Sequence, residues 1–211
     1  MIYRPEIDGL RAISVILVLL YHAGVLGFTG GFIGVDVFFV IRGYLITSLI
    51  LGDIKAHRFS LVRFYEKRAR RILPVFFAVA LSCIPFAYYW MLPEDYTLFL
   101  KSLAGVFLFS SNIVFWRSVD YFNPIADEQP LLHTWSLGVE EQFYLIFPLI
   151  LMVLFKRQRL LQGIILGAAV LSLFASEFLA DRLPGFNFYL LPTRFWEMGD
   201  GSRGSRGFLV C

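Results

Sequence analysis

Long runs of apolar residues, separated by short polar segments, recur along the whole chain. This pattern predicts helices over residues 11–28, 34–52, 72–92, 98–116, 135–155 and 160–178. A membrane-crossing helix needs roughly 20 apolar residues, and several of these runs approach that length. The predicted fold class is therefore all-α, a polytopic transmembrane helical bundle of about five to six membrane segments.

The composition supports a membrane protein. Hydrophobic residues make up 58% of the 211 residues and charged residues 17%, whereas about a quarter of the residues in a soluble domain are charged. The spanning runs leave no room for a sizeable soluble domain. Cys83 lies inside an apolar run and Cys211 at the end of the sequence, so the cysteines form neither a disulfide framework nor a metal-ligand pattern. No metal is expected.

Basic residues predict the orientation. Residues 53–71 hold seven basic and two acidic residues, which favours a cytoplasmic position and puts the amino terminus, two crossings earlier, on the same side. The segment KRQR at 156–159 also favours the cytoplasm, which six full crossings would not allow. We therefore expect one segment not to cross, and 98–116 is the best candidate for a re-entrant segment. The acidic loop 117–133 would then face outward, with Asp120, Asp127 and Glu128.

The first apolar run, RAISVILVLLYH, is bounded by two groups that can carry chemistry. Arg11 and His22 are eleven residues apart, and eleven helical residues span about 16 Å in about three turns, so both side chains share one face. Such a pair suits a ligand with an anionic end and a reactive end. The alternative is that Arg11 only anchors the helix and that His22 hydrogen-bonds a neighbouring carbonyl. We predict Arg11 and His22 as catalytic residues, because ionisable groups in membrane segments tend to be functional.

Asp36, near the start of the next run, is the candidate that would orient His22. Across a short glycine-rich hairpin its carboxylate would face the imidazole and raise its basicity. The alternative is an interfacial Asp that caps the start of the helix.

Two arginines precede the third run, in FYEKRARRILP. Arg68 and Arg71 are three residues apart and therefore share a helical face. The planar guanidinium matches phosphate, which makes both arginines candidates for phosphate binding. Contact with anionic lipid headgroups is the alternative.

The segment PLLHTWSLGVEEQFYLIFP holds the secondary candidates His133, Glu140 and Glu141. His133 and Glu140 are seven residues apart, hence close to one helical face if the helix begins early enough. Two carboxylates at a helix start also favour its positive dipole end, which is a purely structural explanation.

The composition changes after Glu197. The segment MGDGSRGSRGFLVC is rich in Gly, Ser and Arg, and we expect it to form neither a packed nor a spanning element. We therefore divide the chain into residues 1–197 and a tail of residues 198–211 with a non-native appearance, explained by a truncation, a shifted reading frame or a cloning scar.

Five motifs in this order resemble the acyltransferase 3 family of bacterial inner-membrane proteins, in its O-antigen acetylase-like branch: YRPEIDGLRAISVILVLLYH, GGFIGVDVFFVIRGYLIT, RFYEKRARRILP, LLHTWSLGVEEQFYLIFP and RFWE. The resemblance implies transfer of an acyl group, usually acetyl, from cytoplasmic acetyl-CoA or another acyl-CoA to a hydroxyl of a cell-envelope glycan. Acyl-CoA is then a co-substrate rather than a bound cofactor. The implied partners are membrane lipid, acyl-CoA and a carbohydrate acceptor, without nucleic acid.

The resemblance also implies residue roles. The family's arginine, ten-residue, histidine motif falls on Arg11 and His22, and its Arg-x-x-Arg motif falls on Arg68 and Arg71. The arginines would hold the phosphates of coenzyme A, while His22 would act as general base on the acceptor hydroxyl or help to pass the acyl group across. O-antigen lipopolysaccharide, peptidoglycan, exopolysaccharide and small glycosides all stay open as acceptors. The implied location is the bacterial inner membrane, with the amino terminus cytoplasmic.

Two departures from the family give alternatives. Arg42 stands before Gly43 and Tyr44, where the family usually has Ser. The family core has about ten transmembrane helices, more than this chain can hold, so the chain resembles the amino-terminal portion. An inactive truncated remnant is therefore one alternative. A proton-coupled transporter with His22 and Asp36 as a relay is another, but it predicts inverted repeats that the sequence lacks.

Overall fold

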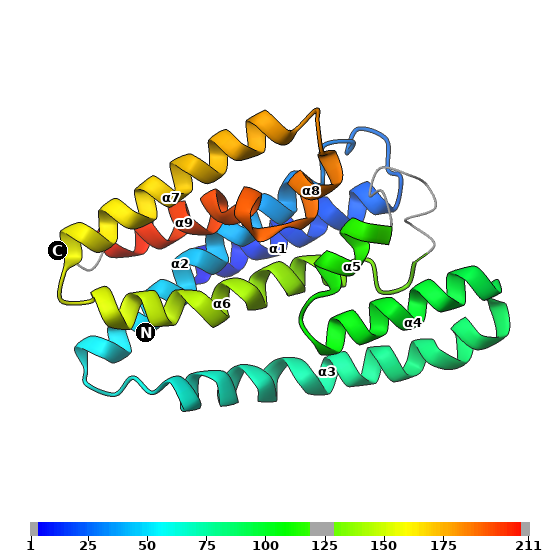
Figure 1. Ribbon diagram of the computed structural model, residues 1–211, viewed down its shortest axis with the longest axis horizontal. Helices are drawn as coiled ribbons and strands as arrows, with labels where there is room; N and C mark the ends of the chain where they lie inside the picture. The colour runs from blue at the N-terminus through cyan, green and yellow to red at the C-terminus, as the bar shows by residue number, and fades with distance from the viewer. Residues whose placement is uncertain (1–3, 119–128, 208–211) are drawn as a thin grey trace. The chain divides into compact units, whose positions relative to one another are not determined.

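A computed structural model describes residues 4–118 and 129–207 of the chain (Figure 1). The described residues form helices and no strands, which confirms the all-α fold class. The acidic residues Asp120, Asp127 and Glu128, for which an outward position is predicted, lie outside the described residues. The chain divides into two compact units: unit 1 is Met1–Arg58, Leu149–Glu177 and Arg194–Cys211, and unit 2 is Phe59–Pro148 and Phe178–Thr193.

The helices match three of the predicted ranges closely, 34–52, 135–155 and 160–178, and differ from the prediction elsewhere. They are α1 (Pro5–His22), α2 (Ile33–Lys55), α3 (Leu61–Trp90), α4 (Pro93–Phe107), α5 (Ser111–Ser118), α6 (Thr134–Leu154), α7 (Gln158–Leu179), α8 (Pro184–Tyr189) and α9 (Leu191–Gly207). Four of the described helices, α2, α3, α6 and α7, are long and apolar enough to cross a membrane. The chain is thus a multi-pass membrane protein, with fewer helices meeting this criterion in its described part than the five to six segments predicted.

The first helix begins and ends six residues earlier than predicted. Pro5 begins α1, with Glu6 and Asp8 in its first turn, where proline and negative charge are both favourable. The helix ends at His22 because Gly24 and Gly27 follow with positive φ angles of 65° and 91°, which glycine adopts readily. His22 is therefore the last residue of α1 rather than an interior one.

In unit 1, α1 and α2 run side by side and in opposite directions (Figure 1). Gly34 of α2 lies against the backbone carbonyl of Ser14, and Gly31, just before α2, lies against that of Leu17. A side chain at either glycine would collide with α1. The glycine-rich hairpin therefore sets both the turn and the close approach of the two helices.

The segment after Glu197 packs, contrary to the expectation that it would form no packed element. It continues α9 as far as Gly207, and Met198 and Ser202 are fully buried. Gly201 lies against the carbonyl of Val40, and Gly43 lies against that of Met198. Because glycine has no side chain, its abundance here permits a close crossing of α9 with α2 that composition alone does not reveal.

In unit 2, α3 begins eleven residues before the predicted start at residue 72. Ser60 caps the helix, since its hydroxyl accepts a hydrogen bond from the backbone N–H of Arg63 at 3.5 Å. The 30 residues of α3 correspond to about 45 Å, longer than the roughly 30 Å hydrocarbon core of a bilayer. Residues 61–71 of the basic segment are therefore the first part of a long helix.

The predicted re-entrant segment 98–116 is not one helix. The chain breaks between α4 and α5, at Phe109, which has a φ angle of 52°. Gly105 of α4 lies close to Val114 of α5, so the two helices fold back on each other. Neither α4 nor α5 is among the described helices that are long and apolar enough to cross a membrane.

Candidate functional site

Arg11 and His22 both lie on α1, as their spacing predicts. His22 is exposed, and its Nδ1 lies 2.8 Å from the carbonyl oxygen of Val18. A carbonyl oxygen only accepts hydrogen bonds, so Nδ1 carries the hydrogen and Nε2 is the basic nitrogen of the neutral ring. The backbone of α1 itself thus fixes the tautomer of His22. Arg11 is partly exposed and forms a long ion pair of 3.4 Å with Asp8 one turn earlier.

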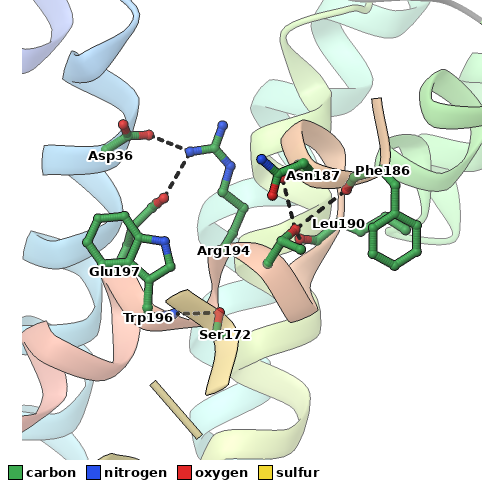
Figure 2. Close-up of polar contacts among 9 residues, drawn as sticks. Asp36, Ser172, Phe186, Asn187, Leu190, Arg194, Trp196 and Glu197 are labelled. Atoms are coloured by element: carbon green, nitrogen blue, oxygen red, sulfur yellow. Dashed lines mark hydrogen bonds and ion pairs between the residues drawn. The ribbon is translucent and has the colours of Figure 1, made fainter. Parts of the chain in front are cut away.

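Asp36 has a different partner from the one that the sequence suggested. Its Oδ1 forms an ion pair with Nη1 of Arg194 on α9, at a distance of 2.8 Å (Figure 2). The physical reason is the register of α1 against α2. Gly34 packs at the level of Ser14, which is eight residues or about 12 Å along the helix from His22. The antiparallel packing therefore carries Asp36 away from the end of α1 where His22 lies.

Arg194 joins two carboxylates. The same Nη1 that contacts Asp36 lies 2.9 Å from Oε1 of Glu197, one turn later on α9 (Figure 2). Glu197 is fully buried. Burial raises the pKa of Glu197 to about 7, because Asp36 adds to the effect of desolvation and Arg194 only partly opposes it. We call Asp36, Arg194 and Glu197 the carboxylate–arginine cluster.

Sequence reasoning did not assign a role to Arg194 or Glu197. Both lie in the RFWE motif that contributes to the family resemblance. The available signal was their spacing of three residues, which puts a cation and a carboxylate on one helical face. The contact with Asp36 spans 158 positions, and no local pattern predicts it.

A hydrogen bond between α7 and α9 holds the segment that carries the cluster. The hydroxyl of Ser172 on α7 accepts from the backbone N–H of Trp196 at 3.1 Å (Figure 2). Ala169, one turn earlier on α7, lies beside Gly199. Small residues on α7 therefore bring this helix close to α9 as well.

Arg42, which departs from the family pattern, lies near Arg11. The guanidinium carbon of Arg42 is 4.5 Å from the centre of the Phe38 ring, and that of Arg11 is 5.8 Å from the same ring. Two cations of unit 1 thus share one aromatic side chain, an arrangement that concentrates positive charge beside α1.

In unit 2, Arg68 joins α3 to α6. Its Nη2 lies 3.1 Å from Oε1 of Glu140 and 2.9 Å from Oε1 of Glu141, and its guanidinium lies over the ring of Tyr144, 3.5 Å from the centroid. The hydroxyl of Tyr65 donates to the carbonyl of Leu145 at 3.0 Å and adds a second link between the two helices.

The two arginines of the Arg-x-x-Arg motif differ in their surroundings. The Arg68 side chain is 17% exposed and faces two carboxylates, whereas Arg71 is exposed. The geometry therefore favours Arg71 over Arg68 for contact with an external anion.

His133 and Glu140 do not share a helix. Helix α6 begins at Thr134, one residue after His133, so the condition for placing them on one face is not met. His133 is exposed and Glu140 is buried. No cluster of His, Cys, Asp and Glu in residues 4–118 and 129–207 has the form of a metal site.

Comparison with known proteins identifies relatives. A family model described as an acyltransferase domain matches residues 4–210, a range that includes most of the segment after Glu197. No solved structure is a significant match.

Two curated relatives bear informative names. O-acetyltransferase OatA of Staphylococcus aureus (strain NCTC 8325 / PS 47) is 40% identical over 158 residues, 74% of this chain and 26% of the relative. Peptidoglycan O-acetyltransferase OatA of Listeria monocytogenes is 39% identical over 179 residues, 81% of this chain and 28% of the relative. The chain thus spans little more than a quarter of the length of these relatives.

Proposed function

Because the chain belongs to the acyltransferase 3 family, we propose that it acts in O-acylation at a bacterial membrane, moving an acetyl group from acetyl-CoA to a hydroxyl of a cell-wall glycan. The observation that carries the proposal is the composition of α1. A cation at Arg11 and an imidazole with a fixed tautomer at His22 lie on one helix, eleven residues apart. Peptidoglycan is the favoured acceptor, since a relative with 39% identity carries that substrate in its name. Lipopolysaccharide has no such support.

His22 is the proposed general base. Its Nε2 would take the proton of the acceptor hydroxyl while the oxygen attacks the thioester carbonyl carbon and the C–S bond breaks. The thiolate of coenzyme A leaves and receives a proton, so the reaction is balanced without a further reagent. General-base catalysis of this kind commonly contributes about 10²- to 10⁴-fold to a rate.

The proposed anion-binding residues lie in each unit separately. In unit 1, Arg11 offers a partly exposed guanidinium on the same helix as His22. In unit 2, Arg71 is exposed on α3, while Arg68 contributes by holding Glu140 and Glu141 rather than by direct contact. We expect the acyl donor to provide the anion that these arginines bind, because coenzyme A carries phosphates that guanidinium groups bind well. The basic start of α3 would be cytoplasmic, and so would the amino terminus.

The test is transfer of labelled acetyl from acetyl-CoA to peptidoglycan fragments in membranes that contain this chain. We expect transfer above that of empty membranes and a loss of about 100-fold or more in His22→Ala. His22→Gln, which keeps a polar side chain but no base, should be equally inactive. Equal transfer with and without His22 would exclude the catalytic role. Transfer by a full-length relative but not by this chain would establish the inactive-remnant alternative.

A further inference from the structure

The carboxylate–arginine cluster holds more negative than positive groups. A single nitrogen, Nη1 of Arg194, lies 2.8 Å from Asp36 and 2.9 Å from Glu197 (Figure 2). The exposed fractions of the side chains are 14% for Arg194, 28% for Asp36 and 0% for Glu197. With both carboxylates ionised, this largely buried cluster would carry one net negative charge.

An uncompensated buried charge is costly, and a proton on one carboxylate removes it. Glu197 is the group that fits the proton better. It is the more deeply buried of the two carboxylates, and among the described residues its Oε2 is buried without a hydrogen-bond partner. A protonated carboxyl still accepts from Arg194 through Oε1 and leaves a neutral pair of Asp36 with Arg194.

Within residues 4–118 and 129–207, the charged groups that shift the pKa of Glu197 are Arg194 on its own helix and Asp36 on α2. Helix α7 brings Ser172 and Ala169 to this part of α9, and neither titrates. Two carboxylates that share one cation raise the pKa of one of them, in agreement with the value of about 7 for Glu197.

We propose that Asp36, Arg194 and Glu197 form a proton-binding site between α2 and α9 of unit 1, in which Glu197 takes up and releases the proton and Arg194 positions both carboxylates. Glu197 directly precedes Met198, whose backbone meets Gly43 at the close crossing of the two helices. Loss of the proton puts a second negative charge between α2 and α9 and weakens this crossing. The inference goes beyond acyl transfer and does not depend on it.

The sign of the pH dependence follows from the pKa of Glu197 in the two states. It is about 7 in the folded chain, against an ordinary value of 4.5. At a pH below the ordinary value, Glu197 carries the proton in both the folded and the unfolded chain, and the site does not lower the free energy of unfolding. Between the two values only the unfolded chain releases it, so the free energy of unfolding falls as the pH rises. Above about 7 the loss is complete and constant.

The experiment measures thermal unfolding of the full chain in detergent from about pH 5 to about pH 8, with Glu197→Gln as the mimic of the protonated side chain. We expect the midpoint of the original chain to fall over this range and that of Glu197→Gln to stay level and to be higher at the alkaline end. Glu177→Gln is the matched control, since Glu177 is exposed on α7 of the same unit, and should keep the original profile.

A direct reading of the proton comes from infrared spectroscopy of the same samples. A carbonyl band of a protonated carboxylic acid should be present in the original chain at about pH 6, should disappear at about pH 9, and should be missing from Glu197→Gln. Asp36→Asn removes the competing carboxylate and should shift the disappearance of the band to lower pH. The proposal is overturned if Glu197→Gln unfolds with the same pH profile as the original chain, or if the band is unaffected by that substitution.

Discussion

The guanidinium of Arg68 on α3 donates to the carboxylate of Glu141 on α6 at 2.9 Å, and the two residues are 73 positions apart in sequence. Glu140 shares the same nitrogen at 3.1 Å, and the ring of Tyr144 lies beneath the guanidinium. The first arginine of the Arg-x-x-Arg motif is therefore part of the contact between α3 and α6. This distinguishes it from Arg71, which is exposed one turn later.

Replacing Arg68 should destabilise unit 2. In Arg68→Ala the carboxylates of Glu140 and Glu141 lose their shared cation, and breaking a buried ion pair commonly costs about 3 to 5 kcal/mol. The measurement is the free energy of unfolding in denaturant, followed by tryptophan fluorescence, with α3 and α6 expected to separate first. Double replacement with Glu141→Gln should recover part of the loss, because fewer charges are then left unpaired.

Replacing Arg71 should weaken donor binding and leave stability nearly unchanged, in contrast to the replacement of Arg68. In Arg71→Ala the free energy of unfolding should change by no more than about 0.5 kcal/mol, as for other exposed sites, while the KM for acetyl-CoA should rise. Arg63→Ala, a second exposed arginine of α3, is the control for loss of charge alone. A large loss of stability in Arg71→Ala with an unchanged KM would contradict the division of roles between the two arginines.

The close crossing of α2 with α9 predicts that replacing Gly43 by alanine lowers the stability of the chain. Gly43→Ala would drive a methyl group into the backbone carbonyl of Met198, and overpacking of this kind costs about 1 to 3 kcal/mol. Gly52→Ala is the matched control on the same helix, because among the described residues no atom beyond its chain neighbours and the nearby backbone of its own helix lies within 4 Å of the position of its added carbon. There the substitution should be neutral or stabilising by up to about 1 kcal/mol. Equal effects at both sites, measured by thermal unfolding, would show that α9 does not pack on α2.

Because the guanidiniums of Arg11 and Arg42 lie near the same Phe38 ring, we expect replacement of Arg42 to change anion binding at Arg11. Arg42→Ser removes one of the two guanidiniums at that ring and leaves Arg11 in place. If Arg11 binds the anionic donor, loss of the neighbouring positive charge should raise the KM for acetyl-CoA by about 3- to 10-fold, equivalent to about 0.7 to 1.4 kcal/mol, with little change in kcat. A lower KM or a higher kcat in Arg42→Ser would instead show that Arg42 obstructs the site.

The apolar pattern predicted the helices best where a run is long and bounded by polar residues. Helix α2 covers Ile33–Lys55 against the predicted 34–52, and α6 covers Thr134–Leu154 against 135–155. The prediction failed at the start of α3, which was placed at residue 72, although the charged residues 61–71 form a helix once Ser60 caps it. It also failed for the segment after Glu197, where glycine and serine were taken as signs of an unpacked tail but serve close helix contact.

By itself, the sequence determined the all-helical membrane class, the order of the family motifs and the spacing of Arg11 and His22 on one helix, since these depend on residues close together in the chain. Only the tertiary structure decided the partners of the charged groups. Asp36 meets Arg194 rather than His22, and Arg68 meets Glu140 and Glu141. The reason is that such pairs depend on the register at which helices cross, which for Asp36 is set by Gly34 and Gly43. A one-turn shift of that register would give Asp36 a different neighbour.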